Sequence, residues 1–197
     1  IQRAKRSMEK LQNLAKDVNK FLYRESNVEN KNVKYHHCKL KESIELAIRF
    51  IKHQMNYDVE IELDMQTALN VCGQSGKLSQ AFMNLLTFLT FDNEDVEQKK
   101  HSQKKLKIFT LEVNQQQTTL RIAGSDKTIS PDKFSRIFQP LYTNFKPEYE
   151  IENSLVTSRQ IIESYGGNIK AQPLSASKEG LHFDICLPLY NSPATHL

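Results

Sequence analysis

The chain has 197 residues, of which 39% are hydrophobic and 25% are charged. This composition is typical of a globular protein with a buried core, and it excludes a fibrous or disordered chain. No apolar run reaches the roughly 20 residues of a membrane span, and the first residues are polar and basic, so we expect no signal peptide, no membrane segment and a soluble, cytoplasmic protein. The chain begins at Ile1 rather than methionine, which leaves open that it is a fragment.

The cysteines and histidines give no metal-binding pattern. Cys38, Cys72 and Cys186 are far apart and share no CxxC spacing, so idle or buried thiols in a reducing compartment are favoured over a disulfide framework. His36 and His37 are adjacent, and adjacent side chains on an extended chain point apart. We therefore expect no metal site.

The net charge of +4 is concentrated at the start of the chain. Residues 1–25 contain seven Lys or Arg and three Asp or Glu, a difference of +4, so the remainder is neutral. A basic helix can bind nucleic-acid phosphates, and such binding has a strong salt dependence. These charges surround an apolar seam, however, so a solvated helical surface is the favoured interpretation and a polyanion-binding helix the third alternative.

Apolar residues near the N-terminus recur with alternating steps of three and four. A period of 3.5 residues predicts a helix that pairs lengthwise with another helix, so we expect a homodimer. One amphipathic helix packed on its own domain is the alternative. A polar, Asn-rich linker follows, and helix and linker together form a first unit, residues 1–30. The seam consists of Ile1, Ala4, Met8, Leu11, Ala15, Val18 and Leu22.

The rest of the chain predicts an α+β domain over residues 31–190, followed by a tail over 191–197. Apolar and acidic residues alternate over 59–64, as in a strand with one wet face. Gly166 and Gly167 follow a helical pattern and provide a helix end. Together the elements predict a two-layer sandwich with a mixed sheet. In chain order they are helices over 39–55 and 76–90, with the strand over 59–64 between them, a hairpin over 106–113 and 118–123, helices over 131–138 and 155–165, and strands over 169–172 and 181–187; residues 139–154 are irregular.

Three stretches resemble the histidine-kinase ATP-binding domain (GHKL or HATPase type). Residues 160–169 resemble its last helix and turn, residues 134–144 resemble its Ile-Phe-Glu-Pro-Phe-Tyr-Thr pattern, and residues 180–188 resemble its final strand. The resemblance implies the histidine-kinase-like ATPase fold, preceded by part of the dimerisation helix of a sensor kinase. These positions carry packing and turn geometry, so they imply the fold more than the activity.

The first nucleotide motif of the family is altered. In the family it reads Asn-Leu-Leu-x-Asn-Ala-x-Lys on a helix, where two asparagines one turn apart reach Mg²⁺ and the phosphates. Here Asn84 remains, Phe88 replaces the second asparagine and Phe91 replaces the basic residue. A phenyl ring offers no lone pair to a hard cation, so we expect weakened magnesium binding.

The second motif, Asp-Asn-Gly-x-Gly, supplies an aspartate to the adenine amino group. In this chain Gly124 falls at the aspartate, Asp126 at the first glycine and Thr128 at the second. A shifted alignment with Asp126 as the adenine acceptor would break the match over residues 129–131. Loss of this contact typically costs about 1.5–3 kcal/mol.

The third motif is a Gly-Leu-Gly-Leu turn whose amides hold phosphate at a helix N-terminus. Residues 152–155 stand there, with Glu152 and Ser154 at the glycine positions. The bulk and negative charge of Glu152 oppose phosphate binding.

The resemblance leaves two signalling functions open. The first is a degenerate, dimeric histidine-kinase-like module, a pseudokinase with no catalytic residue and no cofactor, which acts on a response regulator or another signalling protein. The second is an active but divergent sensor kinase that uses Mg-ATP to phosphorylate a histidine, with Asn84, Asn93, Asp126 and Lys146 as replacement ligands. No histidine here lies in the family's phosphoacceptor motif, which would have to lie upstream of Ile1.

Overall fold

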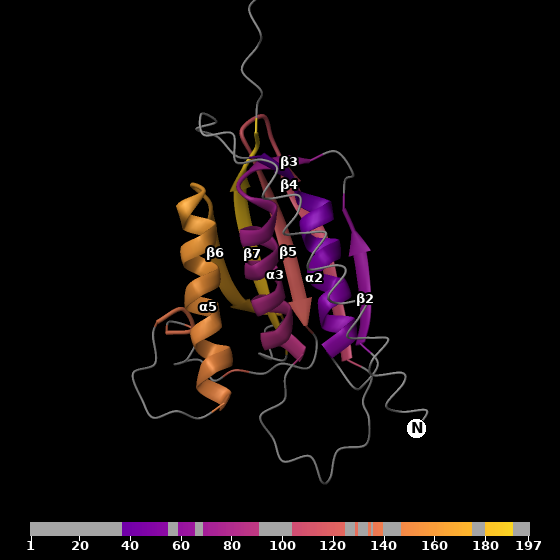
Figure 1. Ribbon diagram of the computed structural model, residues 1–197, viewed down its shortest axis with the longest axis vertical. Helices are drawn as coiled ribbons and strands as arrows, with labels where there is room; N and C mark the ends of the chain where they lie inside the picture. Colours follow the sequence, from indigo (N-terminus) through magenta and orange to yellow (C-terminus); the bar gives the residue numbers. More distant parts are fainter. Residues whose placement is uncertain are drawn as a thin grey trace, which may run out of the picture.

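The structure, a computed structural model, describes residues 37–54, 59–65, 69–90, 104–124, 129, 134, 136–139, 147–174 and 180–190. Within these ranges a mixed sheet of five strands, in the order β2-β4-β5-β7-β6, is covered on one face by three helices (Figure 1). The predicted α+β fold, a two-layer sandwich with a mixed sheet, is therefore confirmed.

The helix layer is built around α3 (Ser75–Thr90), which lies between α2 (Leu40–Gln54) and α5 (Pro147–Ser164) (Figure 1). Its sequence places a large apolar side chain at every third or fourth position, so one face of the helix is apolar. That face is fully buried, and it makes α3 the centre of the core. The side chains concerned are Leu78, Phe82, Leu85 and Leu89.

The sheet combines one parallel pair with three antiparallel pairs. Edge strand β2 (Val59–Asp64) runs parallel to β4 (Lys104–Val113). Strand β4 forms a hairpin with β5 (Gln117–Gly124), and β5 pairs with β7 (Leu181–Pro188), whose other neighbour is β6 (Asn168–Pro173). The predicted hairpin and closing strand pair are both confirmed.

Successive residues of β7 point to opposite faces of the sheet, as in any strand. Phe183, Ile185 and Leu187 are fully buried on the face that carries the helices. His182 and Asp184 belong to the other face, which we call the outer face. The two faces of this one strand therefore meet different surroundings.

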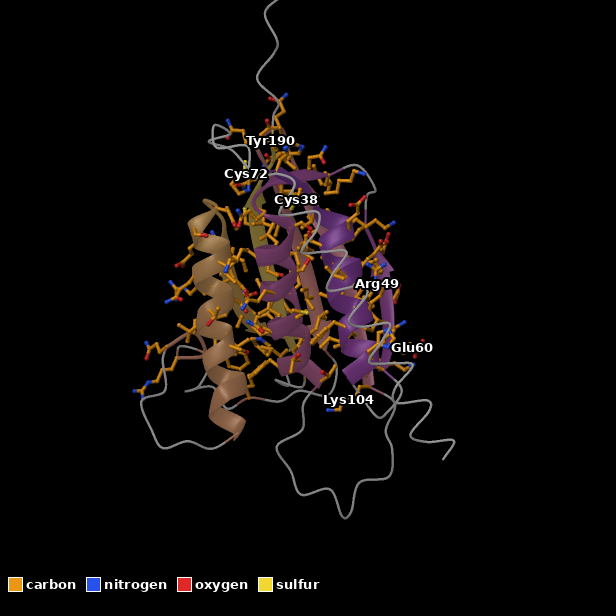
Figure 2. The ribbon with its side chains drawn as sticks, viewed as in Figure 1. Cys38, Arg49, Glu60, Cys72, Lys104 and Tyr190 are labelled. Atoms are coloured by element: carbon orange, nitrogen blue, oxygen red, sulfur yellow. The ribbon has the colours of Figure 1, made fainter. Side chains whose placement is uncertain are left out.

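Two short strands were missed in the sequence. β1 (His37–Lys39) and β3 (Asn70–Cys72) form a separate antiparallel pair of three residues each, which is too short to show a period. The ring of Tyr190 stacks on that of His37, with 4.4 Å between centroids. Cys38, Cys72 and Tyr190 lie at one end of the domain, and Lys104 lies at the opposite end (Figure 2).

The predicted start of the last helix was wrong. α5 begins at Pro147 rather than near residue 155, so the stretch expected to be irregular is helical from Pro147 onward. Proline suits the first helical position, because its missing N–H has no partner there in any helix. Of the short helix expected over 131–138, Phe134 is helical and residues 136–138 form a turn.

Several predictions fall outside the described residues. The N-terminal seam from Ile1 to Leu22, the linker and the tail over 191–197 all do. In the part of the chain that the structure covers, no helix is both long enough and apolar enough to cross a membrane.

Candidate functional site

The asparagine that remains from the first nucleotide motif is bound to a neighbouring helix. The side-chain Nδ2 of Asn84, on α3, donates a hydrogen bond of 3.1 Å to the main-chain oxygen of Ser154 on α5. The same oxygen accepts a hydrogen bond of 2.9 Å from the hydroxyl of Ser158. The amide of Asn84 therefore holds α3 and α5 together.

One turn further along α3, Phe88 belongs to an aromatic cluster, which we define as Phe88, Phe138 and Phe183. Phe88 is 4% exposed and meets Phe183 edge-to-face, with 6.1 Å between centroids and 61° between rings. Phe138 lies 6.1 Å from Phe183, and the guanidinium of Arg159 on α5 lies 5.9 Å from the Phe138 ring. Aromatic packing of this kind is stabilising beyond the area that it buries. The position of the second family asparagine is thus part of the core.

Gly124 ends β5 at a point with little room for a side chain. A Cβ atom there would lie 3.3 Å from Cδ2 of Leu89 and 3.3 Å from Cδ2 of Leu106. These two leucines are themselves buried. An acidic residue at position 124 would therefore need the leucines to move, so both the carboxylate and its space are missing.

The third motif lies inside a helix rather than at its start. Residues 152–155 are the sixth to ninth residues of α5. In an α-helix only the first four N–H groups lack an intrahelical acceptor, which in α5 means positions 147–150. The amides of residues 152–155 therefore bond within the helix, and no phosphate cradle forms there.

The motif positions nevertheless converge in space. Asn84 and Ser154 are in contact, Phe88 follows Asn84 by one turn, and Gly124 abuts Leu89, the residue after Phe88. These positions meet between α3 and α5 and at the adjoining end of β5, but together they form packed contacts. The described residues do not fit Mg-ATP in the manner that the resemblance implies.

The remaining candidates lie outside the described residues. They include three of the replacement ligands proposed for an active kinase. In the described part of the chain, no group of three or more His, Cys, Asp or Glu is placed to hold a metal ion. The candidates concerned are Phe91, Asn93, Asp126, Thr128, Lys146 and the side chain of Glu152.

A charged cluster on the outer face of the sheet was not predicted from the sequence. Arg121 on β5 donates two hydrogen bonds to the carboxylate of Asp184 on β7, of 2.6 and 2.7 Å. Nε2 of His182 lies 3.7 Å from the same carboxylate. Alternation along β7 places His182 and Asp184 on one face, but only the register of β5 on β7 brings Arg121 beside them.

The protein matches known proteins by structure and not by sequence. No family model matches the chain, and no curated protein does either. A mycobacterial sensor histidine kinase, MprB, is 18% identical, with a TM-score of 0.61 over 79% of this chain and 97% of that one. The catalytic domain of the histidine kinase ThkA is 21% identical, with a TM-score of 0.58 over 79% of this chain and 98% of that one.

A longer match is the histidine kinase AdeS of Acinetobacter baumannii. It is 20% identical, with a TM-score of 0.57, over 93% of this chain and 81% of that one. At these identities the likeness is one of fold, and it agrees with the resemblance read from residues 134–144 and 160–169. The chain has the fold of a histidine-kinase catalytic domain.

Proposed function

We propose that this chain is a degenerate sensor histidine-kinase-like module that binds ATP weakly or not at all and signals by protein contact. The observation that carries the proposal is the unbroken helix through residues 152–155, with Asn84 bound to the carbonyl of Ser154. Phosphate binding by the third motif depends on free amides at a helix start. A helix that continues through the motif supplies none.

Two further changes support the same conclusion. Phe88 packs on Phe183 where a magnesium ligand is implied, and Gly124 lies against leucines where an adenine acceptor is implied. Each lost charge-assisted contact typically costs about 1.5–3 kcal/mol, which corresponds to roughly ten- to a hundredfold in affinity. Because three motifs are altered together, we expect no useful affinity for Mg-ATP and no resident cofactor.

The decisive test is isothermal titration of the full chain with ADP and with a non-hydrolysable ATP analogue, each with and without Mg²⁺. We expect no heat at millimolar nucleotide, while the catalytic domain of an active histidine kinase, as positive control, binds. Binding tighter than about 100 µM (about −5.5 kcal/mol) that improves with Mg²⁺ would overturn the proposal. The divergent sensor kinase, using Asn84, Asn93, Asp126 and Lys146, would then be favoured.

Because the aromatic cluster is packed without ligand, we also expect a stable fold in the absence of nucleotide. The thermal midpoint should lie in the usual range for domains, above about 40 °C. A lower midpoint that nucleotide raises would indicate a pocket that needs its ligand.

We further propose that the module is a homodimer through the N-terminal seam and contacts a response regulator or another signalling protein. A strict 3.5-residue period supports the dimer. Leu11→Lys places a charge in the seam and should yield a monomer by light scattering, whereas Gln12→Lys, one position off the seam, should not. A dimeric Leu11→Lys protein would remove this part of the proposal.

A further inference from the structure

His182 is buried in an unusual state. Its side chain lies on the outer face of the sheet, yet the residue is only 5% exposed. Within the part of the chain that the structure describes, neither Nδ1 nor Nε2 has a hydrogen-bond partner. A neutral imidazole carries one donor and one acceptor, and buried polar atoms are nearly always paired. An unpaired, buried imidazole therefore calls for an explanation beyond packing.

The charged groups around His182 come from three strands. On its own strand, the carboxylate of Asp184 lies 3.7 Å from Nε2 and is already held by Arg121 of β5. On β6, Lys170 stands in register with Asp184. Beside His182 itself, the register places two uncharged residues, Ala123 and Gln172. Lys170 is exposed, so among the described residues the charges that act on the neutral imidazole are one cation, Arg121, and one anion, Asp184.

A proton on His182 changes this balance. An imidazolium has two N–H donors, and in the described residues Asp184 is the one carboxylate near it. Asp184 can accept from His182 only by sharing a carboxylate that Arg121 now holds with both oxygens. Two cations, the imidazolium and Arg121, would then compete for one anion in a half-buried place, where like charges repel strongly.

We propose that His182 is a proton-operated switch on β7: protonation breaks the Arg121–Asp184 arrangement and loosens the β6–β7 edge of the sheet. The switch is coupled to the helix side of the sheet by the chain itself. Phe183, the next residue, points to the opposite face and contacts both Phe88 and Phe138. A displacement of β7 at His182 would therefore disturb the aromatic cluster between the sheet and α3.

The direction of the pH effect follows from the surroundings. Burial lowers the pKa of His182 below its ordinary value of 6.5, Arg121 lowers the pKa further, and Asp184 opposes both. The folded protein thus binds this proton less readily than the unfolded chain. The contribution of neutral His182 to the free energy of unfolding is fully present above pH 6.5. It decreases as the pH falls from 6.5 toward the folded pKa, because the unfolded chain takes up the proton first.

The first experiment is urea denaturation of the full 197-residue chain at closely spaced pH values between 7.5 and 5.5. The unfolding constant should rise by up to about tenfold per pH unit below 6.5, the slope for uptake of one proton. His182→Leu should abolish this slope. The matched control, His53→Gln on α2, should retain it, because the side chain of His53 is not fully buried and belongs to the helix layer. A slope that survives in His182→Leu, or its absence in the natural chain, would overturn the proposal.

A second measurement does not depend on any variant. Titration of the imidazole NMR signals of the natural chain gives the pKa of His182 directly, and we expect it to lie below the ordinary value of 6.5. Amide hydrogen exchange in β6 and β7 should speed up as that titration proceeds, relative to exchange in β2. A His182 signal that titrates at or above 6.5, or uniform exchange in all strands, would refute the switch.

Discussion

α3 has two helical neighbours, and its boundaries with them are built alike. On the α2 side, the hydroxyl of Ser79 donates a hydrogen bond of 3.0 Å to the main-chain oxygen of Ser43. On the α5 side, the hydroxyl of Ser158 donates one of 3.2 Å to the main-chain oxygen of Ala81. In both cases a small, buried serine reaches across to a carbonyl, so the helices approach closely.

The likeness is informative because the nucleotide motifs that the histidine-kinase resemblance implies lie on α3, at the end of β5 and on α5, and none of them lies on α2. In this chain the second boundary is closed by Asn84, Ser154 and Ser158 in the same way as the first is closed by Ser43 and Ser79. The described contacts at the α3–α5 boundary are thus of the same kind as those at the α2–α3 boundary. Substitutions on each side can test whether the two boundaries are equally stabilising.

The largest expected effect comes from emptying the core at either boundary. Phe88→Ala, on α3 where the ring packs on Phe183, should lower the free energy of unfolding by about 3–5 kcal/mol, and Ile44→Ala, on α2, by about 2–5 kcal/mol. Both side chains are buried. Urea denaturation measures both. A cost below about 1 kcal/mol for Phe88→Ala alone would show an open pocket on the α5 side and break the comparison.

A somewhat smaller loss should follow from restoring the family residue on β5. Gly124→Asp places a carboxylate between Leu89 and Leu106, and we expect a loss of roughly 2–4 kcal/mol with no gain of nucleotide binding. Gly124→Ala, the control, adds a methyl group without a charge and should cost less. Nucleotide binding by the Asp variant in calorimetry would mean that the pocket has kept its room.

Ser79 and Ser158 allow the same substitution to be compared at the two helix boundaries. Ser79→Ala removes the hydrogen bond to the carbonyl of Ser43, and Ser158→Ala removes a hydroxyl whose single hydrogen is shared between the carbonyls of Ala81 and Ser154. Each substitution should cost about 1 kcal/mol. Both positions are mid-helical, so the change in helix propensity is the same and cancels between them. Unequal losses, differing by more than about 1 kcal/mol in chemical denaturation, would show that the two boundaries are not equivalent.

The smallest effect is expected on the outer face of the sheet, where β2 and β4 are joined by exposed ion pairs. Glu62 and Lys107 meet at 3.0 Å with side chains more than half exposed. Such pairs contribute about 0–1 kcal/mol and weaken with salt. Glu62→Gln should therefore change the thermal midpoint little at low salt and not at all at high salt. A larger loss would assign the outer face a structural role.

The sequence predicted the long elements well because each has a clear period. The apolar stripe of α3 and the alternation over residues 59–64 led to the observed α3 and β2 with bounds correct to within a residue. The strands β1 and β3 were missed because three residues carry no period, and their pairing depends on contacts that are distant in sequence. Most of the fold could therefore be predicted from the sequence, except the parts that depend on how distant strands pair.

For the candidate site, the residue types could be read from the sequence, whereas their arrangement in space could not. The sequence marked Phe88 and Gly124 as departures from the family motifs, which stays a prediction about nucleotide binding, but it placed the start of α5 eight residues late. Family likeness suggested a turn near residue 152, and the helix-compatible sequence after Pro147 overrode it. The hydrogen bond from Asn84 to Ser154 spans 70 positions, and no local pattern predicts it. His182 was overlooked because it lies on the outer face of β7, where alternation along the strand predicts an exposed side chain, and yet it is buried.

The end of α3 has a practical consequence for protein engineering. Nζ of Lys104, the first residue of β4, donates a hydrogen bond of 2.7 Å to the main-chain oxygen of Thr90, the last residue of α3. The two ends of segment 91–103 are thus held together by residues outside it. Because the entropic cost of lengthening a loop grows only slowly with its length, a reporter domain or affinity tag inserted within 91–103 should leave the sheet and helices unchanged.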